Sequence, residues 1–245
     1  MNKKFFLSIS FLIVCAIALT ATSCGGDSEP EIIDNSTTNV NVTINGHKFV
    51  DLGLPSGTLW AETNIGASTP YEDGDYFAWG ETKSKTDYSE YTYKYGLYLN
   101  RTKYNLKDGK TTLDAADDAA TTNWGTGCRM PSVEELQELK DKCSCIWQPE
   151  YNGVSGCLIT GPNGNCIFLP AAGAYCDKEL LDKGSYGYYW SRAVYPGPDT
   201  YNLANHLLFG NDRFIPSAVL HRECGFLVRP VATTTVTTSS KNYTK

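Results

Sequence analysis

The sequence predicts an α+β fold in which antiparallel sheets are combined with one or two short helices and long loops. One segment, residues 132–143, has the pattern of a capped amphipathic helix, whereas most of the remaining chain consists of short β-type runs separated by Gly, Pro and Asn. The 245 residues are 41% hydrophobic and include 16 Tyr and 22 Gly. A chain of this size and composition forms one sizeable β-rich domain with extensions rather than several domains.

Residues 1–23 have the organisation of a signal peptide. Lys3 and Lys4 precede an apolar run over residues 5–18 that is too short for a transmembrane helix. Small residues then lead directly to Cys24 in the sequence LTATSC, which resembles a bacterial lipobox. This resemblance implies cleavage before Cys24 and lipid attachment to it, so the lipid bilayer is an expected partner. An ordinary secretory signal with an incidental cysteine is the alternative.

Residues 24–43 are expected to form an acidic and polar tether, flexible in its first part (GGDSEPE). That part resembles the acidic export signals that follow the lipidated cysteine in surface lipoproteins of Bacteroidota. We therefore expect an outer-membrane protein that is lipid-anchored and faces the cell exterior.

The domain is expected over residues 44–231, beginning with a hairpin. Residues 41–49 place Asn-Gly between alternating apolar residues, which is the strongest short-range hairpin signal. Between residues 88 and 107, tyrosines alternate with polar residues, as in half-buried strands or in a surface loop rich in aromatics. A short helix is expected over residues 113–123, which are Asp-rich at their start.

The best-defined helix covers residues 132–143. Ser132 is a favourable N-cap, and Glu135 completes a capping box. Carboxylates occupy the first turn and lysines the last, as the helix macrodipole favours. We expect one apolar face to pack against a sheet, and its members are Val133, Leu136, Leu139 and Cys143.

Further strands are expected after this helix. Residues 156–169 have the pattern of strand, turn and strand, and residues 188–194, 203–209 and 226–231 are β-type runs. The Thr- and Ser-rich tail, residues 232–245, is expected to be disordered.

Seven of the nine cysteines remain once Cys15 is removed with the signal peptide and Cys24 carries lipid. Outside the cytoplasm we expect disulfides or buried thiols, and with seven cysteines at least one stays free or bonds another molecule. Cys157 and Cys166, on the two arms of the hairpin at 156–169, are candidates for a disulfide. No C-x-x-C spacing occurs and the three histidines are scattered, which argues against a structural zinc site.

Six sequence blocks occur in series: VDLGLPSGTLWAETNIGA (50–67), YFAWGE (76–81), RMPSVEELQEL (129–139), GPNGNCIFLPAAG (161–173), GSYGYYWS (184–191) and GFLVRPV (225–231). Together they resemble the Fibrobacter succinogenes major paralogous domain, a family of secreted and lipid-anchored proteins of Bacteroidota. Single blocks also resemble the wider C-type-lectin-like group, which includes formylglycine-generating enzymes. The resemblance implies a C-type-lectin-like fold, and it implies no particular activity, because one fold hosts many functions.

The chain has no recognisable catalytic motif, and we predict no catalytic, cofactor-binding or metal-binding residues. Formylglycine-generating enzymes need a cysteine pair spaced by four residues to hold copper, whereas this sequence has no C-x4-C spacing and only the lone Cys224 near His221 and Arg222. The G-x-S-x-G and H-E-x-x-H motifs of hydrolases are also absent from the sequence. A net charge of −6 argues against nucleic acid as a partner.

Residues 188–222 combine aromatics with Asn, Asp, His and Arg on turn-forming Pro and Gly, the composition of a loop-borne recognition surface. Within this segment we expect the core to contain Trp190, Leu203, Leu207 and Phe209. We expect exposure and ligand binding from Tyr195, Asp199, Tyr201, Asn205, Asn211 and Asp212. Pro198-Asp199 and Asn211-Asp212 resemble pieces of calcium-dependent lectins, although their spacing and flanks differ. Calcium is therefore the one cofactor that the sequence does not exclude.

The first hypothesis is therefore a non-enzymatic, adhesin-like domain that binds a glycan or a protein at the cell surface. An enzyme of the formylglycine-generating or hydrolase type is the second hypothesis. The third is a surface assembly or filament-tip component, joined to its partners through the odd cysteine or an exposed edge strand.

Overall fold

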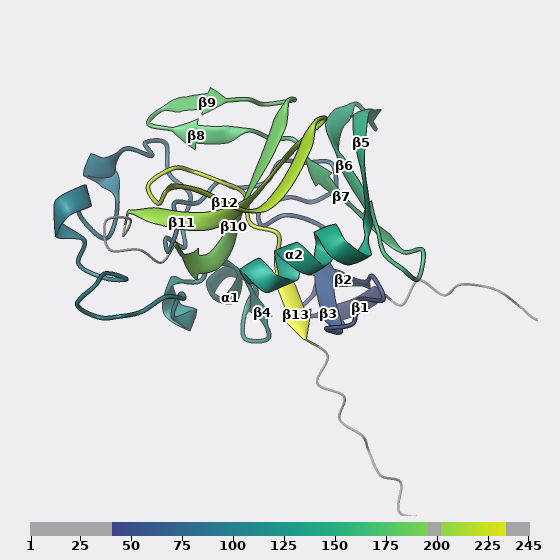
Figure 1. Cartoon of the computed structure of the whole chain (residues 1–245), viewed down its shortest axis with the longest axis horizontal. Helices are drawn as coiled ribbons and strands as arrows, with labels where there is room; N and C mark the ends of the chain where they lie inside the picture. The colour runs from purple at the N-terminus through teal and green to yellow at the C-terminus, as the bar shows by residue number, and fades with distance from the viewer. Residues whose placement is uncertain (1–40, 196–201, 234–245) are drawn as a thin grey trace, which may run out of the picture. The chain divides into compact units, whose positions relative to one another are not determined.

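A computed structural model describes residues 41–195 and 202–233 of the chain (Figure 1). Within these residues the strands pair antiparallel in four sheets, and two short α-helices accompany them. The predicted combination of antiparallel sheets with one or two short helices and long loops is therefore confirmed.

The largest sheet joins the two ends of the described chain. Its order is β1-β2-β3-β13-β4, with β1 (Asn41–Ile44), β2 (His47–Asp51), β3 (Thr58–Ala61), β13 (Val231–Thr233) and β4 (Cys128–Arg129). Val231 pairs with Trp60 on one side and with Arg129 on the other. The expectation that the segment 232–245 is disordered is therefore wrong for Ala232 and Thr233, which pair with β3, and the rest of that segment lies outside the described residues.

The predicted hairpin at 41–49 is confirmed. Asn45 and Gly46 connect β1 to β2, with φ angles of 51° and 85°. A two-residue turn with positive φ at both positions matches the twist of the flanking strands, and Asn-Gly adopts it at little cost.

Three smaller sheets contain the remaining strands. One consists of β5 (Ser144–Tyr151), β6 (Val154–Thr160) and β7 (Cys166–Pro170), and a second of β10 (Tyr186–Val194), β11 (Leu203–Gly210) and β12 (Arg213–His221). The third is the hairpin of β8 (Ala174–Cys176) and β9 (Glu179–Leu181). The expected strand at 226–231 is instead an extended segment that makes isolated bridges to Phe77 and Tyr189 before β13 begins.

Helix α2 (Val133–Lys142) has the predicted capping box. The Ser132 hydroxyl accepts from the Glu135 amide, and the Glu135 carboxylate accepts from the Ser132 amide at 2.8 Å. Leu136 and Leu139 are fully buried where the helix packs on β10, β11 and β12 (Figure 1). The expectation that this helix covers a sheet is confirmed.

The carboxylate of Glu135 also fixes the preceding strand. It accepts from both terminal nitrogens of Arg129, at 2.6 and 2.7 Å, and from the Thr58 hydroxyl at 2.8 Å. One buried side chain therefore caps α2 and connects it to β4 and β3.

The expected helix at 113–123 is a 3-10 turn, η3 (Ala115–Asp117), followed by α1 (Ala119–Trp124). The tyrosine-rich segment before it is a loop with two further 3-10 turns, η1 (Glu90–Thr92) and η2 (Tyr98–Asn100). Tyrosines are buried in this loop at positions 88, 93, 95 and 104, whereas Tyr91 is 87% exposed. The loop alternative stated for this segment is therefore the observed one.

An aromatic cluster lies at the centre of the core. Trp190 stacks on Phe226 with ring centroids 4.0 Å apart, and His206 packs against Phe226 at 4.9 Å. His206 is 2% exposed, and its Nδ1 has no partner among the described residues. Burial disfavours the imidazolium and lowers the pKa of His206 to about 3.

The first prediction concerns Glu135. Glu135→Gln should lower the free energy of unfolding by about 2 kcal/mol, because it removes the charge bound by Arg129 and the Ser132 amide. Urea denaturation followed by tryptophan fluorescence measures this change. Glu134→Gln, exposed in the same turn, is the matched control and should change stability by less than about 0.5 kcal/mol. Equal losses in both variants would contradict the assigned role.

The second prediction concerns pH. The unfolded-state pKa of histidine is about 6.5, so the contribution of neutral His206 is complete above that pH and is lost as pH falls toward 3. Between pH 7 and pH 5 the wild type should therefore lose about 2 kcal/mol more stability than His206→Phe. Parallel stability curves for wild type and His206→Phe would exclude this effect.

Candidate functional site

The structure separates the residues predicted to bind ligand. Tyr195 is 38% exposed, as expected, and follows the end of β10. The expectation that Asn205 is exposed is wrong: it is 6% exposed, and its Nδ2 donates to the Val194 carbonyl at 3.1 Å. Asp199 and Tyr201 lie outside the described residues.

Asn211 and Asp212 are exposed, but they occupy the turn between β11 and β12, at the opposite end of that sheet from Tyr195. The eight residues of β11 place roughly 25 Å between the two ends. Asp212 is also paired with Arg213 through two hydrogen bonds of 2.6 and 2.9 Å. These predicted residues do not form one site.

Three further expectations concern metal binding, membrane spanning and lipid attachment. Among residues 41–195 and 202–233, no group of three or more His, Cys, Asp or Glu side chains is arranged to hold a metal ion. No helix in the same ranges is long and apolar enough to cross a membrane. Cys24, the predicted lipid-attachment residue, lies outside the described residues.

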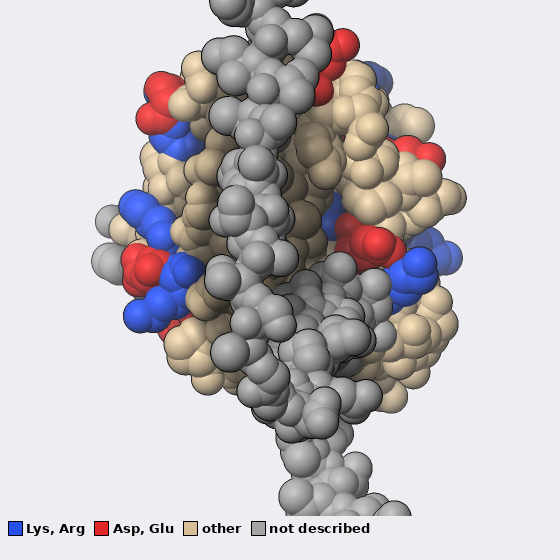
Figure 2. Space-filling view, turned by 90° about the vertical axis from the view of Figure 1, so that its right-hand side faces the viewer, with Lys and Arg blue, Asp and Glu red and all other residues tan. Residues whose placement is uncertain are grey.

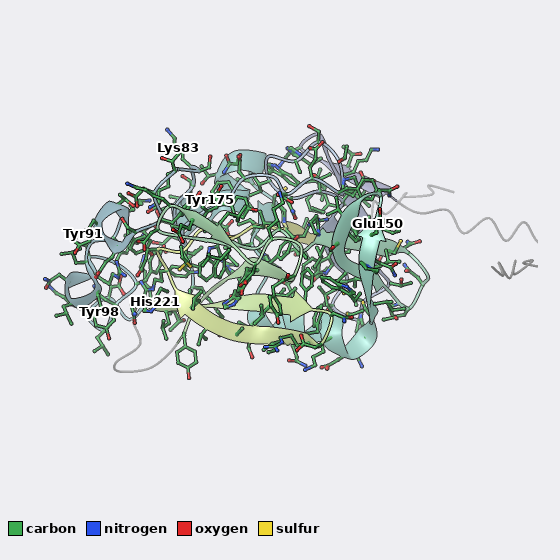
Figure 3. All side chains as sticks on the ribbon, turned by 90° about the horizontal axis from the view of Figure 1, so that it is seen from above. Lys83, Tyr91, Tyr98, Glu150, Tyr175 and His221 are labelled. Carbon is green, nitrogen blue, oxygen red and sulfur yellow. The ribbon has the colours of Figure 1, made fainter. Side chains whose placement is uncertain are left out.

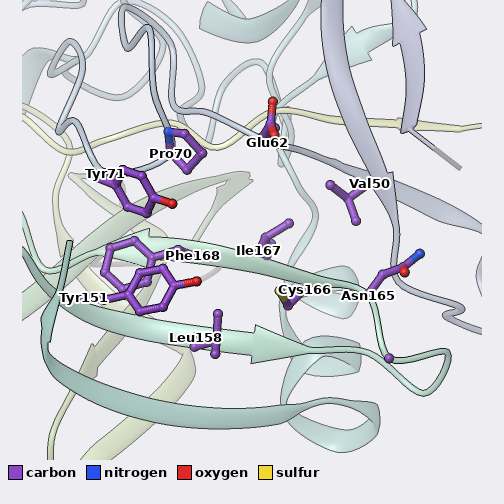
Figure 4. A pocket seen from close by; sticks show the side chains of 11 residues that line it. Val50, Glu62, Pro70, Tyr71, Tyr151, Leu158, Asn165, Cys166, Ile167 and Phe168 are labelled. Atoms are coloured by element: carbon purple, nitrogen blue, oxygen red, sulfur yellow. The ribbon is translucent and has the colours of Figure 1, made fainter. Parts of the chain in front are cut away.

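A better-formed site lies at the end of the domain that contains β5. In Figure 3, Glu150 of β5 lies toward this end, whereas Tyr98 and His221 lie toward the opposite end. Here a pocket of about 280 Å³ opens between the β5–β6–β7 sheet and the segment that follows β3 (Figure 4). It is lined by side chains including those of Glu62, Pro70, Tyr71, Tyr151, Cys166 and Phe168.

Three aromatic rings form one wall of the pocket. Tyr151 stacks on Phe168 with centroids 4.9 Å apart, and Tyr71 contacts both, at 5.6 and 5.9 Å. Phe168 is buried, whereas the two tyrosines are half-buried. Figure 4 shows both tyrosine hydroxyl groups directed along the pocket. The wall therefore offers apolar ring faces and hydroxyl groups to the same space.

Polar groups lie on the opposite side of the pocket. Glu62 contributes a carboxylate whose side chain is 35% exposed and whose nearest cation, Lys48, is 3.9 Å away. Asn165 is held in place, since its Nδ2 donates to the Asp51 carbonyl at 2.7 Å. Cys166 adds an exposed thiol. The pocket thus combines an aromatic wall with one weakly paired carboxylate.

Arg229 connects the two walls of the pocket through hydrogen bonds. Its guanidinium is fully buried and donates to the Glu62 carbonyl at 2.6 Å and to the Phe168 carbonyl at 2.9 Å. It also donates to the Asn64 side chain at 2.8 Å and to the Ala61 carbonyl at 3.0 Å. The spacing between the walls is therefore set by one rigid side chain.

A second depression of about 430 Å³ lies on the far side of Tyr71. Its lining includes Glu72, Ser155, and the ion pair of Asp73 with Lys183. Because Tyr71 lines both spaces, they are neighbouring parts of one surface. On the uncovered part of the face in Figure 2, charged side chains lie in groups on both sides, and uncharged residues make up most of the rest.

The structure also corrects the cysteine pairing. Cys157 is opposite Leu169 and Cys166 is opposite Thr160, three positions apart along the ladder, so the two thiols lie on different faces of the sheet. This register excludes the candidate disulfide between them. Cys224 is 6% exposed and has its Sγ 3.6 Å from that of Cys176, a neighbour 48 residues away in the sequence.

Comparison with known proteins provides no relative for this chain. A scan of protein-family models and searches of curated proteins and solved structures found no match.

Proposed function

We propose that the protein is a lipid-anchored, outward-facing surface protein that binds a glycan in the pocket between Tyr71, Tyr151 and Glu62. In this proposal the domain at 44–231 is a C-type-lectin-like member of the Fibrobacter succinogenes major paralogous family. The observation that carries the binding function is the aromatic wall formed by two half-buried tyrosines on a buried phenylalanine.

The chemistry of sugars supports this choice of ligand. A pyranose ring has an apolar face of C–H groups that packs on an aromatic ring, and a rim of hydroxyl groups that donate to carboxylates. Ligand sites in general combine apolar and aromatic lining with a few placed polar groups. Tyr71 and Tyr151 supply the first element and Glu62 the second. The depression beyond Tyr71 extends the surface, so a chain of several sugar units suits it better than a monosaccharide.

The lining also favours binding over hydrolysis. Glycosidases use two carboxyl groups on opposite sides of the scissile bond. Glu62 is the single carboxylate among the residues that line the first pocket. A single carboxylate in this pocket supports a binding role for it.

The third prediction tests this pocket. The full-length protein in detergent is screened against neutral xylo-, manno-, cello- and galacto-oligosaccharides, with calcium and with EDTA. Tyr71→Ala and Tyr151→Ala should each weaken binding about tenfold or more, because an aromatic anchor is lost. Calorimetry measures the affinities, and thermal melting verifies that the variants are folded.

Tyr91→Ala, at a tyrosine that is 87% exposed and outside the pocket, is the matched control and should bind as the wild type does. Tyr195→Ala separates the pocket from the predicted loop surface. If Tyr195→Ala abolished binding while Tyr71→Ala did not, the pocket assignment would be wrong. Failure of all oligosaccharides to bind would reject the glycan proposal.

The fourth prediction tests the anchor. Cys24→Ala should move the protein from the membrane fraction to the soluble fraction, because no residue then accepts lipid. Cys15→Ala, within the expected signal peptide, should leave it membrane-bound. External protease on intact cells should degrade the wild-type protein. Complete protection from protease, with lysed cells as the positive control, would contradict outward display.

A further inference from the structure

Two cysteines that are distant in sequence face each other at the surface of the core. Cys176 ends β8, and Cys224 immediately precedes the extended segment at 225–231. Their Sγ atoms are 3.6 Å apart. The two thiols thus need only small side-chain rotations to reach the S–S bond length of about 2 Å.

The backbone on either side of this pair has the geometry that a disulfide needs. Tyr175 and Gly225 exchange both hydrogen bonds, each at 2.9 Å, in an antiparallel bridge. The next residues, Cys176 and Cys224, are therefore a non-hydrogen-bonded pair, in which the Cα atoms approach to about 4.5 Å. Disulfides span Cα separations from roughly 4.4 to 6.8 Å. The bond is thus compatible with the backbone as it stands.

The other cysteines are less well placed. Cys145 is opposite Ile159 rather than Cys157, so these two thiols are diagonal neighbours on adjacent strands. Cys166 is exposed at the start of β7. Cys145 and Cys157 are in hydrogen-bond contact but out of register, so among the described cysteines Cys176 and Cys224 form the pair in which backbone register and thiol distance agree.

We propose that Cys176 and Cys224 are a redox-active pair that forms an intramolecular disulfide by exchange with a small disulfide oxidant. In the first step the Cys176 thiolate attacks one sulfur of glutathione disulfide and releases one glutathione thiolate. In the second step Cys224 loses its proton and attacks the Cys176 sulfur, which releases the second glutathione. The protein loses two protons and two electrons, and glutathione disulfide takes them up to become two thiols.

The environments of the two thiols assign the order of these steps. Cys176 is half-buried and lines an open depression of about 570 Å³ with Asp87, Ser89 and Lys178, so an oxidant reaches it. Cys224 is 6% exposed and lies behind it. A hydrogen bond from Cys224 lowers the pKa of Cys176 to about 7, and the same contact together with burial raises the pKa of Cys224. Cys176 therefore has the larger thiolate fraction of the two at neutral pH, and it attacks first.

The disulfide would fasten the β8–β9 hairpin to the core. Cys224 is two residues from Phe226, which is fully buried against Trp190. The bond would also close a loop that contains β9, β10, β11 and β12, and a loop of this length restricts the unfolded chain strongly. Oxidation should thus stabilise the whole domain rather than the hairpin alone.

The test uses the full-length protein in detergent, reduced and then incubated with glutathione disulfide. After free thiols are blocked with N-ethylmaleimide, chymotrypsin cleavage at Tyr175 separates Cys176 from the cysteines before it. We expect the peptide that begins at Cys176 to be linked to the peptide that contains Cys224. Oxidation should raise the melting temperature by about 5–15 °C.

Variants separate this bond from other cysteine chemistry. Cys176→Ser with Cys224→Ser should make the melting temperature insensitive to oxidation, whereas Cys166→Ser should keep the wild-type response. Full N-ethylmaleimide labelling of Cys224 in the oxidised, denatured protein would overturn the proposal. A link from Cys224 to any cysteine other than Cys176 would overturn it as well, as would copper retained by the two thiolates.

Discussion

The candidate site depends on one buried cation. Arg229 is 1% exposed, and its four hydrogen bonds go to neutral oxygens, three of them backbone carbonyls. Burial lowers its pKa to about 10, so it stays charged at neutral pH. A buried guanidinium is tolerated only when its donors are satisfied, and these four oxygens supply acceptors for it. The segment at 61–64 and strand β7 are consequently held at a fixed separation, and the pocket lies between them.

Buried side chains also hydrogen-bond to backbone groups elsewhere in this loop-rich domain. The Asp118 carboxylate is 1% exposed and accepts from the amides of Ala120, Thr121 and Met130, which fixes α1 against β4. Buried tyrosine hydroxyl groups also pair with the backbone. Those of Tyr76, Tyr88 and Tyr93 donate to backbone carbonyls. Long loops expose backbone polar groups that no helix or strand pairs, and here side chains pair them. The abundance of tyrosine in the sequence therefore has a structural cause.

Features that depend on a few neighbouring residues could be predicted from the sequence, and features that depend on the fold could not. The capping box of α2 and the Asn45-Gly46 turn each involve residues within about four positions of one another, so their patterns were sufficient. Tyr71 and Tyr151 meet only because β5 is folded beside the segment after β3, and nothing local distinguishes them from the other tyrosines. Asn205 was misassigned because four consecutive residues of β11 are buried, so polarity did not indicate the exposed face.

The order of a site before binding also determines how much conformational entropy is lost when a ligand binds. A site on flexible loops loses conformational entropy when it closes on a ligand, and that cost reduces affinity. The pocket avoids most of this cost because its parts are already ordered: Phe168 supports both tyrosine rings, and Asn165 is fixed to β2. Tyr195 and Asp212 belong to opposite ends of one sheet, so a ligand would have to span that sheet to engage both. A preformed aromatic pocket held in place by buried side chains is therefore the stronger physical basis for the proposed ligand binding.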